Sequence, residues 1–419
     1  MTKQEAAIKY ITENYLDFNR LRHDVVSDKL QIRMEADLEG SEWFNVVQNG
    51  SELSFKKTTL NNIEREALNN IEQGYWREMT KHDINSIVCH CAQEYDANIT
   101  SREVMTALQS DLIPDVHPLR EYVLSCREWT EEQPDWIDWV AQQVTVKPLG
   151  DEAKGDKARG EGLWRGCFKK WFVAMVASWM KDEVVNHQVL VLIGKQGIFK
   201  TTWLEHLIPP HLRAYACKLA NSNDLNKDER LRIAEFGLIS LDEIDSMNNR
   251  ELNQLKSVIT ATDVNERAAY AYTKERRVRL ASFCASGNRR DFLTDITGNR
   301  RWLPFEVESI QNPFYTLLPY ERMYAQAWAL AQDPLFSYWF DLDEIEVLEE
   351  HNQHFRDESN EEQLLPILFD VPAEGRGEFM TTAQISERLV TYGNIKKPMA
   401  LSRLAWCSVL LDTNQHDLK

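Results

Sequence analysis

The chain has 419 residues, of which 43% are hydrophobic and 27% are charged, and its formal net charge at pH 7 is −18. This length suits two to four domains, and the composition excludes a disordered or collagen-like chain. The acidic balance excludes a protein that coats nucleic acid over its whole surface. Any contact with nucleic acid is therefore expected at a local basic patch.

Cysteine usage and apolar runs predict a protein of the cytoplasm, away from membranes. The seven cysteines are irregularly spaced, which argues against a disulfide framework. Cys89-His90-Cys91 has no second Cys/His pair at zinc-site spacing, so we interpret it as non-ligating. The start shows no secretory signal, and the most apolar run, 171–180, is too short for a membrane span and predicts a buried helix.

The chain divides into six predicted segments, and the fold class is α/β. Alternation of helices with buried strands in one segment is typical of a mostly parallel sheet flanked by helices. In chain order the segments are a small α+β unit (1–65), a helical accessory domain (66–146), a glycine-rich charged linker (147–163), the α/β core (164–310), an acidic helical connector (311–372) and a helix-turn-helix or winged-helix-like unit (373–419).

The strongest functional signal follows a continuous apolar strand at 189–193. A glycine-bearing loop, Lys200-Thr201 and a helix come next, which is the context of a P-loop. Such a loop holds phosphates with backbone N–H groups; Lys200 is expected to reach the β- and γ-phosphates, and Thr201 to bind Mg²⁺. Phe199 replaces the usual glycine, so an ordinary strand–turn–helix is the alternative. The expected nucleotide-binding residues are Gly194, Gln196, Gly197, Ile198, Phe199, Lys200, Thr201 and Thr202.

Two further strands end in polar residues that suit ATP hydrolysis. The apolar strand at 236–241 ends in Asp242 and Glu243, which predicts a Walker B motif. Asp242 is expected to hold Mg²⁺, and Glu243 to polarise the attacking water. A strand at 279–285 leads to Asn288, which suits a sensor of the γ-phosphate at the tip of a strand beside Walker B.

Arg300 and Arg301 follow the sensor strand. Paired arginines next to a turn suit an arginine finger that a neighbouring subunit supplies. The sequence leaves open which of the two is the finger, and a surface pair engaged in ion pairs is the alternative.

Four stretches together resemble the virulence-associated protein E family, which is related to the superfamily 3 helicases of phage and plasmid replication. The stretches are 194–202, 241–245, 255–270 and 281–305. The resemblance covers about residues 165–310. It implies an AAA+-like ATPase that uses ATP and Mg²⁺, assembles into a homo-oligomeric ring, expected to be a hexamer, and acts on DNA.

The resemblance also implies where DNA binds. In superfamily 3 helicases, a hairpin between Walker B and the sensor strand contacts DNA in the central channel. Residues 254–305 hold ten Lys or Arg against five Asp or Glu. Contact with single-stranded DNA is therefore expected at Lys274, Arg276 and Arg277, with Arg279 in the same basic segment; a solvated basic face is the alternative.

These features predict a DNA-dependent ATPase, a ring-forming replicative helicase of a mobile genetic element such as a prophage or genomic island. Two alternatives stay open: a regulatory or anti-phage defence ATPase that assembles without unwinding DNA, and a replication-initiation scaffold. We assign no catalytic acidic pair of a primase to residues 1–150, so we expect either that a primase partner is a different protein or that this chain lacks one.

Overall fold

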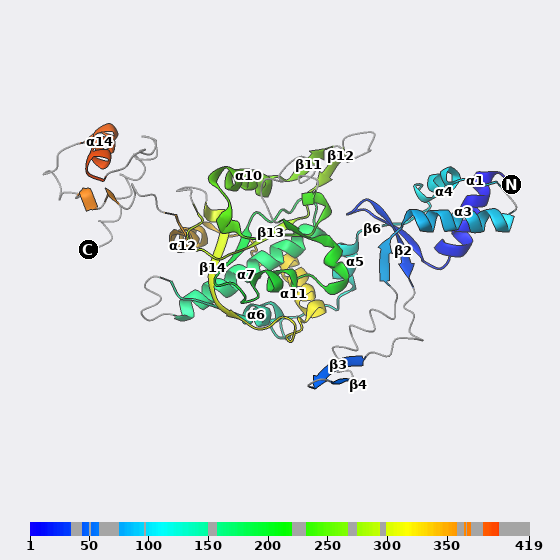
Figure 1. The fold of residues 1–419 in the computed structure, drawn as a ribbon, viewed down its shortest axis with the longest axis horizontal. Coiled ribbons are helices and arrows are strands. Elements are labelled where there is room, and N and C mark those ends of the chain that lie inside the picture. The colour runs from blue at the N-terminus through cyan, green and yellow to red at the C-terminus, as the bar shows by residue number, and fades with distance from the viewer. Residues whose placement is uncertain are drawn as a thin grey trace.

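The computed structural model contains an N-terminal unit, a central α/β unit and a C-terminal helix, in that order along its longest axis (Figure 1). The residues that it describes are 1–34, 44–49, 52–57, 75–95, 98–149, 157–219, 232–266, 275–293, 299–357, 364–365, 367–369 and 380–393.

The N-terminal unit is built on a four-stranded sheet in the order β5-β2-β1-β6. Its helices pack together, and their apolar side chains share one core with Leu21 of the sheet. The elements are α1 (Lys3–Ile11), η1 (Thr12–Leu16), β1 (Leu21–Asp24), β2 (Lys29–Met34), β5 (Tyr75–Glu78), α3 (Lys81–Tyr95), α4 (Ser101–Leu108) and β6 (Asp115–Val116). A separate antiparallel hairpin consists of β3 (Phe44–Asn49) and β4 (Glu52–Lys57).

The sequence predicts a boundary between two segments at residue 65, but the N-terminal unit continues across it. One sheet and one core cross that position, because β5, α3 and α4 pack with α1, β1 and β2. Cys91 is buried in this shared core. The rest of the predicted accessory domain belongs to the central unit: α5 (Pro118–Ser125), α6 (Trp136–Ala141) and β7 (Val144–Val146).

The central unit contains a six-stranded sheet in the order β7-β14-β8-β13-β10-β9. Neighbouring strands from β14 to β9 are parallel, and β7 pairs antiparallel with β14 at the edge. Every residue of β8 is buried, as expected for a strand covered on both faces. The strands are β8 (Val189–Ile193), β9 (Ala216–Leu219), β10 (Leu238–Leu241), β13 (Ser282–Gly287) and β14 (Trp302–Ile310).

Helices cover both faces of this sheet (Figure 1). Leu190 and Leu192 of β8 join a core with the aromatic residues of α7 (Lys157–Met180) and with α11 (Tyr320–Gln332). Val189, Val191 and Ile193 join a second core with α10 (Asn249–Thr260). The predicted mostly parallel sheet flanked by helices is therefore what this unit forms. Short elements complete it: α8 (Lys200–Glu205), η3 (Pro210–Tyr215), η5 (Ile244–Ser246), β11 (Asp263–Glu266), β12 (Glu275–Val278) and η6 (Asn299–Arg301).

The central unit is longer than the predicted segment 164–310. Helix α7 begins at Lys157, within the predicted linker. Helix α11 buries Met323 and Tyr324 in the core, and the Asn352 amide of α12 (Leu342–Gln353) donates to the carbonyl of Trp302 at 3.0 Å. The region expected to be an acidic connector thus completes the core, because the buried faces of α11 and α12 pack on the sheet.

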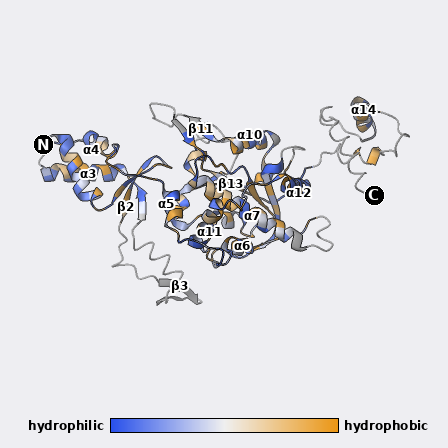
Figure 2. Cartoon of the chain, turned by 180° about the vertical axis from the view of Figure 1, so that it is seen from behind, coloured by the Kyte–Doolittle hydropathy of each residue, from blue (hydrophilic) through white to orange (hydrophobic). Residues whose placement is uncertain are grey.

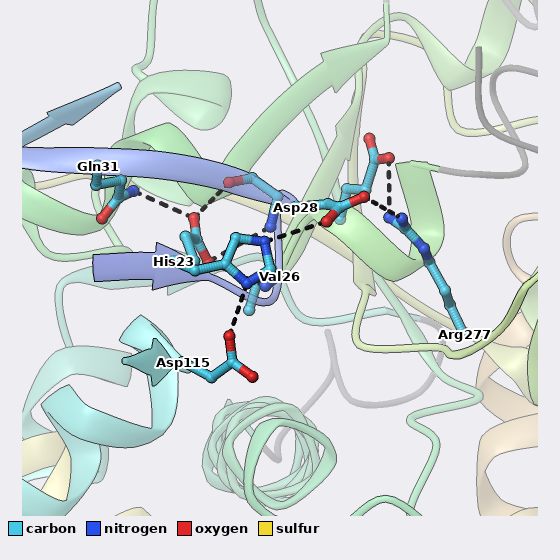
Figure 3. A network of polar contacts seen from close by, with 9 residues as sticks. His23, Val26, Asp28, Gln31, Asp115 and Arg277 are labelled. Atoms are coloured by element: carbon cyan, nitrogen blue, oxygen red, sulfur yellow. Dashed lines mark hydrogen bonds and ion pairs between the residues drawn. The ribbon is translucent and has the colours of Figure 1, made fainter. Parts of the chain in front are cut away.

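A turn between β1 and β2 joins the two units (Figure 3). Val26 of this turn is buried in the core of the central unit. The polar contacts across the junction are Tyr215 to Asp24 (2.8 Å), Gln31 to Tyr215 (3.1 Å), Arg22 to Glu121 (2.8 Å) and Arg277 to Asp28 (2.8 Å).

The C-terminal helix α14 (Thr382–Gly393) lies at the end opposite the N-terminal unit (Figure 1). It lies within the predicted C-terminal unit (373–419), and Leu389 packs with Leu365 in a small cluster. The predicted second helix, and with it the helix-turn-helix or winged helix, lies outside the described residues.

The hydrophobic parts of the helices and strands, coloured orange, gather toward the middle of the central unit (Figure 2). The run 171–180 lies in α7, and its residues 171–179 are buried, as predicted. Within the described part of the chain, every helix is too short or too polar to span a membrane.

Candidate functional site

The predicted site residues meet where three parallel strands end. Lys200 follows β8, Asp242 follows β10, and Asn288 follows β13, which lies between those two strands. The pairing of β13 with β10 confirms that the expected sensor strand lies beside the expected Walker B strand. Carboxyl ends of parallel strands form one edge, which is where open α/β sheets bind ligands.

The Lys200 ammonium lies inside the 194–199 loop. Its Nζ donates to the carbonyl oxygens of Gly194 and Lys195, both at 2.7 Å, and to Oδ1 of Asn288 at 3.3 Å. Lys200 is only 7% exposed. Burial lowers the pKa of Lys200, and two nearby carboxylates partly offset that effect. The loop therefore holds a buried positive charge at its centre, where an anion can bind.

The backbone of the 194–199 loop explains its glycines and the departure at Phe199. A side chain at Gly194 would meet the carbonyl oxygen of Val307 at 2.8 Å. Gly197 has φ +82°, and Phe199 has φ 67° and ψ 19°, so both adopt the left-handed conformation. The usual glycine at position 199 adopts it freely, whereas another residue pays about 1–2 kcal/mol. Phe199 thus keeps the backbone conformation that glycine would favour.

Thr201, Ser286 and Asp242 form a polar triangle beside Lys200. The Thr201 hydroxyl lies 2.9 Å from the Ser286 hydroxyl and 3.3 Å from Oδ1 of Asp242, which Ser286 contacts at 2.8 Å. Lys218 of β9 pairs with Oδ2 of Asp242 at 2.7 Å. Burial raises the pKa of Asp242, but the hydrogen bonds from Lys218 and Ser286 outweigh it and hold the pKa below its usual value. Asp242 is therefore an ionised carboxylate at neutral pH.

This donor set fits Mg²⁺. The ion prefers oxygen ligands and is commonly held by one or two carboxylates together with substrate phosphates and water. Thr201 and Asp242 offer a hydroxyl and a carboxylate at one point. Across the described ranges, no three His, Cys, Asp or Glu residues form a group that could hold a metal. One hydroxyl and one carboxylate suit an ion that takes its other ligands from phosphates and water.

The residues after Asp242 shape the rest of this edge. Glu243 is exposed and has φ 52°, a strained conformation that costs a non-glycine residue about 1–3 kcal/mol and clusters at functional sites. Asp245 accepts hydrogen bonds from the backbone N–H groups of Asn288 and Arg289, both at 3.1 Å. Asp245 therefore fixes the tip of β13.

Sequence reasoning missed Lys218 and Ser286. Ser286 could have been found, because it precedes Gly287-Asn288 at the end of the expected sensor strand. Lys218 lies on a strand of four residues that carries no strong apolar run, so only the sheet order reveals that it faces Asp242.

Arg300 and Arg301 lie at the opposite end of the parallel strands, where β8 and β14 begin. They form part of η6, directly before β14, and β14 begins with Trp302 opposite Val189, the first residue of β8. At about 3.3 Å per residue, the length of β8 separates them from the 194–199 loop by roughly 16 Å. An arginine side chain does not span that distance. The pair therefore does not contact a phosphate held by the 194–199 loop of its own chain.

The structure describes only some of the expected DNA-binding residues. Arg277 of β12 forms ion pairs with Asp28 at 2.8 Å and with Glu235 at 3.5 Å (Figure 3). Lys274 lies outside the described residues, and Arg276 is described only by its backbone in β12. Arg277 therefore pairs with carboxylates of its own chain.

Arg279, counted with the basic segment, has a structural role. It is fully buried, and its guanidinium donates to carbonyl oxygens that include Ile259 and Ala261 at the end of α10 and Asn186 at 2.8 Å. Burial lowers its pKa to about 9. Arg279 thus caps the carboxyl end of α10 and offers no charge to a partner.

The fold and the site together define a mixed α/β unit with a lysine-bearing loop and an acidic residue at the carboxyl edge of its sheet. Residues 157–362 match the model of the Virulence-associated protein E-like domain. The match begins at the first residue of α7 and extends past α12, in agreement with the packing of α11 and α12 into the core.

Two solved structures are similar to the chain. The apo structure of the NrS-1 C-terminal region (305-718) has 12% sequence identity and a TM-score of 0.42, and the match covers 86% of this chain and 77% of that one. An A-form apo structure of the same region has 12% identity and a TM-score of 0.39, with 82% and 72% covered. No curated protein matches the chain.

Proposed function

We propose that the central unit binds and hydrolyses ATP with Mg²⁺. The observation that carries this proposal is the convergence of Lys200, Thr201, Asp242 and Asn288 at one edge of the sheet. Lys200 supplies a buried cation for the β- and γ-phosphates, and Thr201 with Asp242 supplies oxygen ligands for Mg²⁺.

Two neighbouring side chains suit the hydrolytic step. Glu243 is exposed next to Asp242, which is the place for a base that polarises the attacking water. Asn288 already contacts Lys200 at 3.3 Å, so its amide can contact the terminal phosphate and that water. Asp245 orients Asn288 through the backbone N–H group at 3.1 Å.

The proposed active form is a homo-oligomer, a ring that we expect to be a hexamer. Its basis is the separation between the 194–199 loop and the arginine pair, which lie at opposite ends of the same parallel strands. In a ring, Arg300 or Arg301 of one subunit reaches the phosphates held by its neighbour, as arginine fingers do.

We further propose a role in DNA replication of a mobile element, as a DNA-dependent ATPase that acts as a helicase. The match of residues 157–362 to the Virulence-associated protein E-like domain supports this role. The proposed contact with single-stranded DNA is at Lys274, in the segment that joins β11 and β12, and at Arg276 in β12. Arg277 is no longer the preferred contact, because Asp28 and Glu235 already pair with it.

Replacing Lys200 with alanine tests the nucleotide site. Lys200→Ala removes the buried cation and is expected to weaken binding of ATP with Mg²⁺ by about 100-fold, in line with about 3 kcal/mol for a charge-assisted contact. Lys195→Ala is the matched control: Lys195 is exposed in the same loop, and its loss should change the Kd by less than threefold. Calorimetric titration measures both. Unchanged ATP affinity in folded Lys200→Ala would contradict the proposal.

A further inference from the structure

Aromatic side chains gather beside the 194–199 loop. The ring of Phe314 meets that of Phe199 edge-on, with centroids 6.3 Å apart, and that of His206 edge-on at 5.5 Å. Phe314 is 63% exposed and the next residue, Tyr315, is 87% exposed. Large exposed aromatic groups that adjoin a polar loop form a surface on which a flat ligand can stack.

The sheet order places this surface on the side of the loop away from the metal residues. Strands β13 and β10, which lead to Asn288 and Asp242, lie on one side of β8, and β14 lies on the other. The segment that bears Phe314 follows β14 and returns to α8, where the Tyr320 hydroxyl donates to the carbonyl of His206 at 2.7 Å. A nucleotide whose terminal phosphate lies toward Asp242 has its base on the Phe314 side.

We infer that Phe314, supported by Phe199 and His206, stacks the base of the bound nucleotide. This inference rests on the proposed function, because it needs phosphates at Lys200. It also accounts for Phe199: glycine would relieve the left-handed conformation, but it would remove the ring that Phe314 contacts.

Stacking defines the class of ligand. An aromatic ring contacts the face of any base, and a purine offers more area than a pyrimidine, so the site accepts purine nucleotides with little discrimination between adenine and guanine. The same surface could instead be covered by a second copy of this chain, and the experiment below separates the two.

The test compares ADP with tripolyphosphate, which has the phosphates and no base. Calorimetric titrations with Mg²⁺ use the full chain, Phe314→Ala, Phe314→Trp and the matched control Leu317→Ala, an aliphatic residue of the same segment that is 48% exposed. Phe314→Ala is expected to weaken ADP binding about tenfold, the scale of one base–aromatic contact, and to leave tripolyphosphate binding unchanged. Phe314→Trp and Leu317→Ala should bind ADP as the parent does.

Two results would overturn the inference. In the first, Phe314→Ala binds ADP like the parent, and a changed sedimentation mass would then assign Phe314 to a contact between copies. In the second, Phe314→Ala loses ADP and tripolyphosphate equally, which would mean that the loop itself collapsed. Failure of the proposed function is distinct, because the parent itself would then bind neither ligand.

Discussion

Phe199 and Glu243 adopt the left-handed conformation on either side of the candidate site. Among the described residues, Asn19 and Asp28 are the other non-glycine residues with positive φ, and their types tolerate it. Asparagine and aspartate side chains can form a local hydrogen bond in this conformation, and phenylalanine and glutamate gain no such hydrogen bond. The surrounding structure therefore holds both residues in a costly conformation, and both lie where phosphate and water are proposed to bind.

Glu243→Gln separates binding from hydrolysis. The substitution keeps the shape of the side chain but removes the carboxylate that polarises water, so hydrolysis should fall at least 100-fold while the ATP Kd changes less than threefold. Single-turnover hydrolysis and calorimetric titration measure the two effects. Glu350→Gln, an exposed residue of α12, is the control and should hydrolyse ATP at the parental rate. Parental turnover in Glu243→Gln would remove Glu243 from the mechanism.

At this scale the sequence predicts much of the site but not all of its contacts. Lys200, Asp242 and Asn288 could be brought together because polar residues that follow buried parallel strands share one edge. Lys218 could not, because its pairing with Asp242 depends on which strand neighbours β10. Charge alone also misplaced Arg279, since the number of basic residues in a segment does not reveal which of them is buried.

Helix α5 contains a titratable cap. The backbone N–H of Arg120 donates to Nδ1 of His117 at 3.3 Å, so the cap needs the neutral imidazole. Burial lowers the pKa of His117 to about 4, from an unfolded value of 6.5. The folded state therefore binds this proton less readily than the unfolded state does. The contribution to stability is complete above pH 6.5 and is lost as the pH falls from there toward 4.

Urea unfolding at pH 7 and pH 5 measures this effect. The free energy of unfolding of the parent should lose about 2 kcal/mol more than that of His117→Asn, which keeps an acceptor at the cap and does not titrate. His187 and His211, whose pKa values burial also lowers, are present in both proteins, so only the difference reports His117. Equal losses in the two proteins would contradict the assignment.

The elements predicted from the sequence agree best with the structure where the sequence pattern that predicts them is local. Strand β8, the buried helix α7 and the first C-terminal helix α14 follow directly from apolar runs and caps. The N-terminal sheet could not be predicted this way, because β1 pairs with β6 across about ninety residues of sequence, His23 lying opposite Asp115. Contacts of such separation depend on the packing of the whole unit.

The junction between the two units combines burial with charge. Asp24 is fully buried and accepts a hydrogen bond from Tyr215, the residue directly before β9. The turn that follows Asp24 also reaches Arg277 on β12 through Asp28 (Figure 3). Exposed ion pairs stabilise little, so Val26 and Asp24 dominate the contact. The N-terminal unit therefore contacts both Tyr215, directly before the strand that bears Lys218, and the hairpin proposed to hold DNA.

The proposed ATPase has a site that two subunits complete. The most direct measurement is steady-state ATP hydrolysis in mixtures of two inactive variants, Glu243→Gln and the double variant Arg300→Ala with Arg301→Ala. Each variant alone lacks one half of every interface, whereas a mixed ring contains some interfaces with an intact Glu243 and intact arginines. Mass measurement on the same samples shows that the variants assemble together.

Equimolar mixing is expected to restore roughly a quarter of the parental rate, the fraction of interfaces that carry both intact halves when subunits mix at random. The double variant alone should bind ATP with little loss, because its arginines lie far from its own 194–199 loop. Mixed assemblies that hydrolyse no ATP would contradict a site shared between subunits.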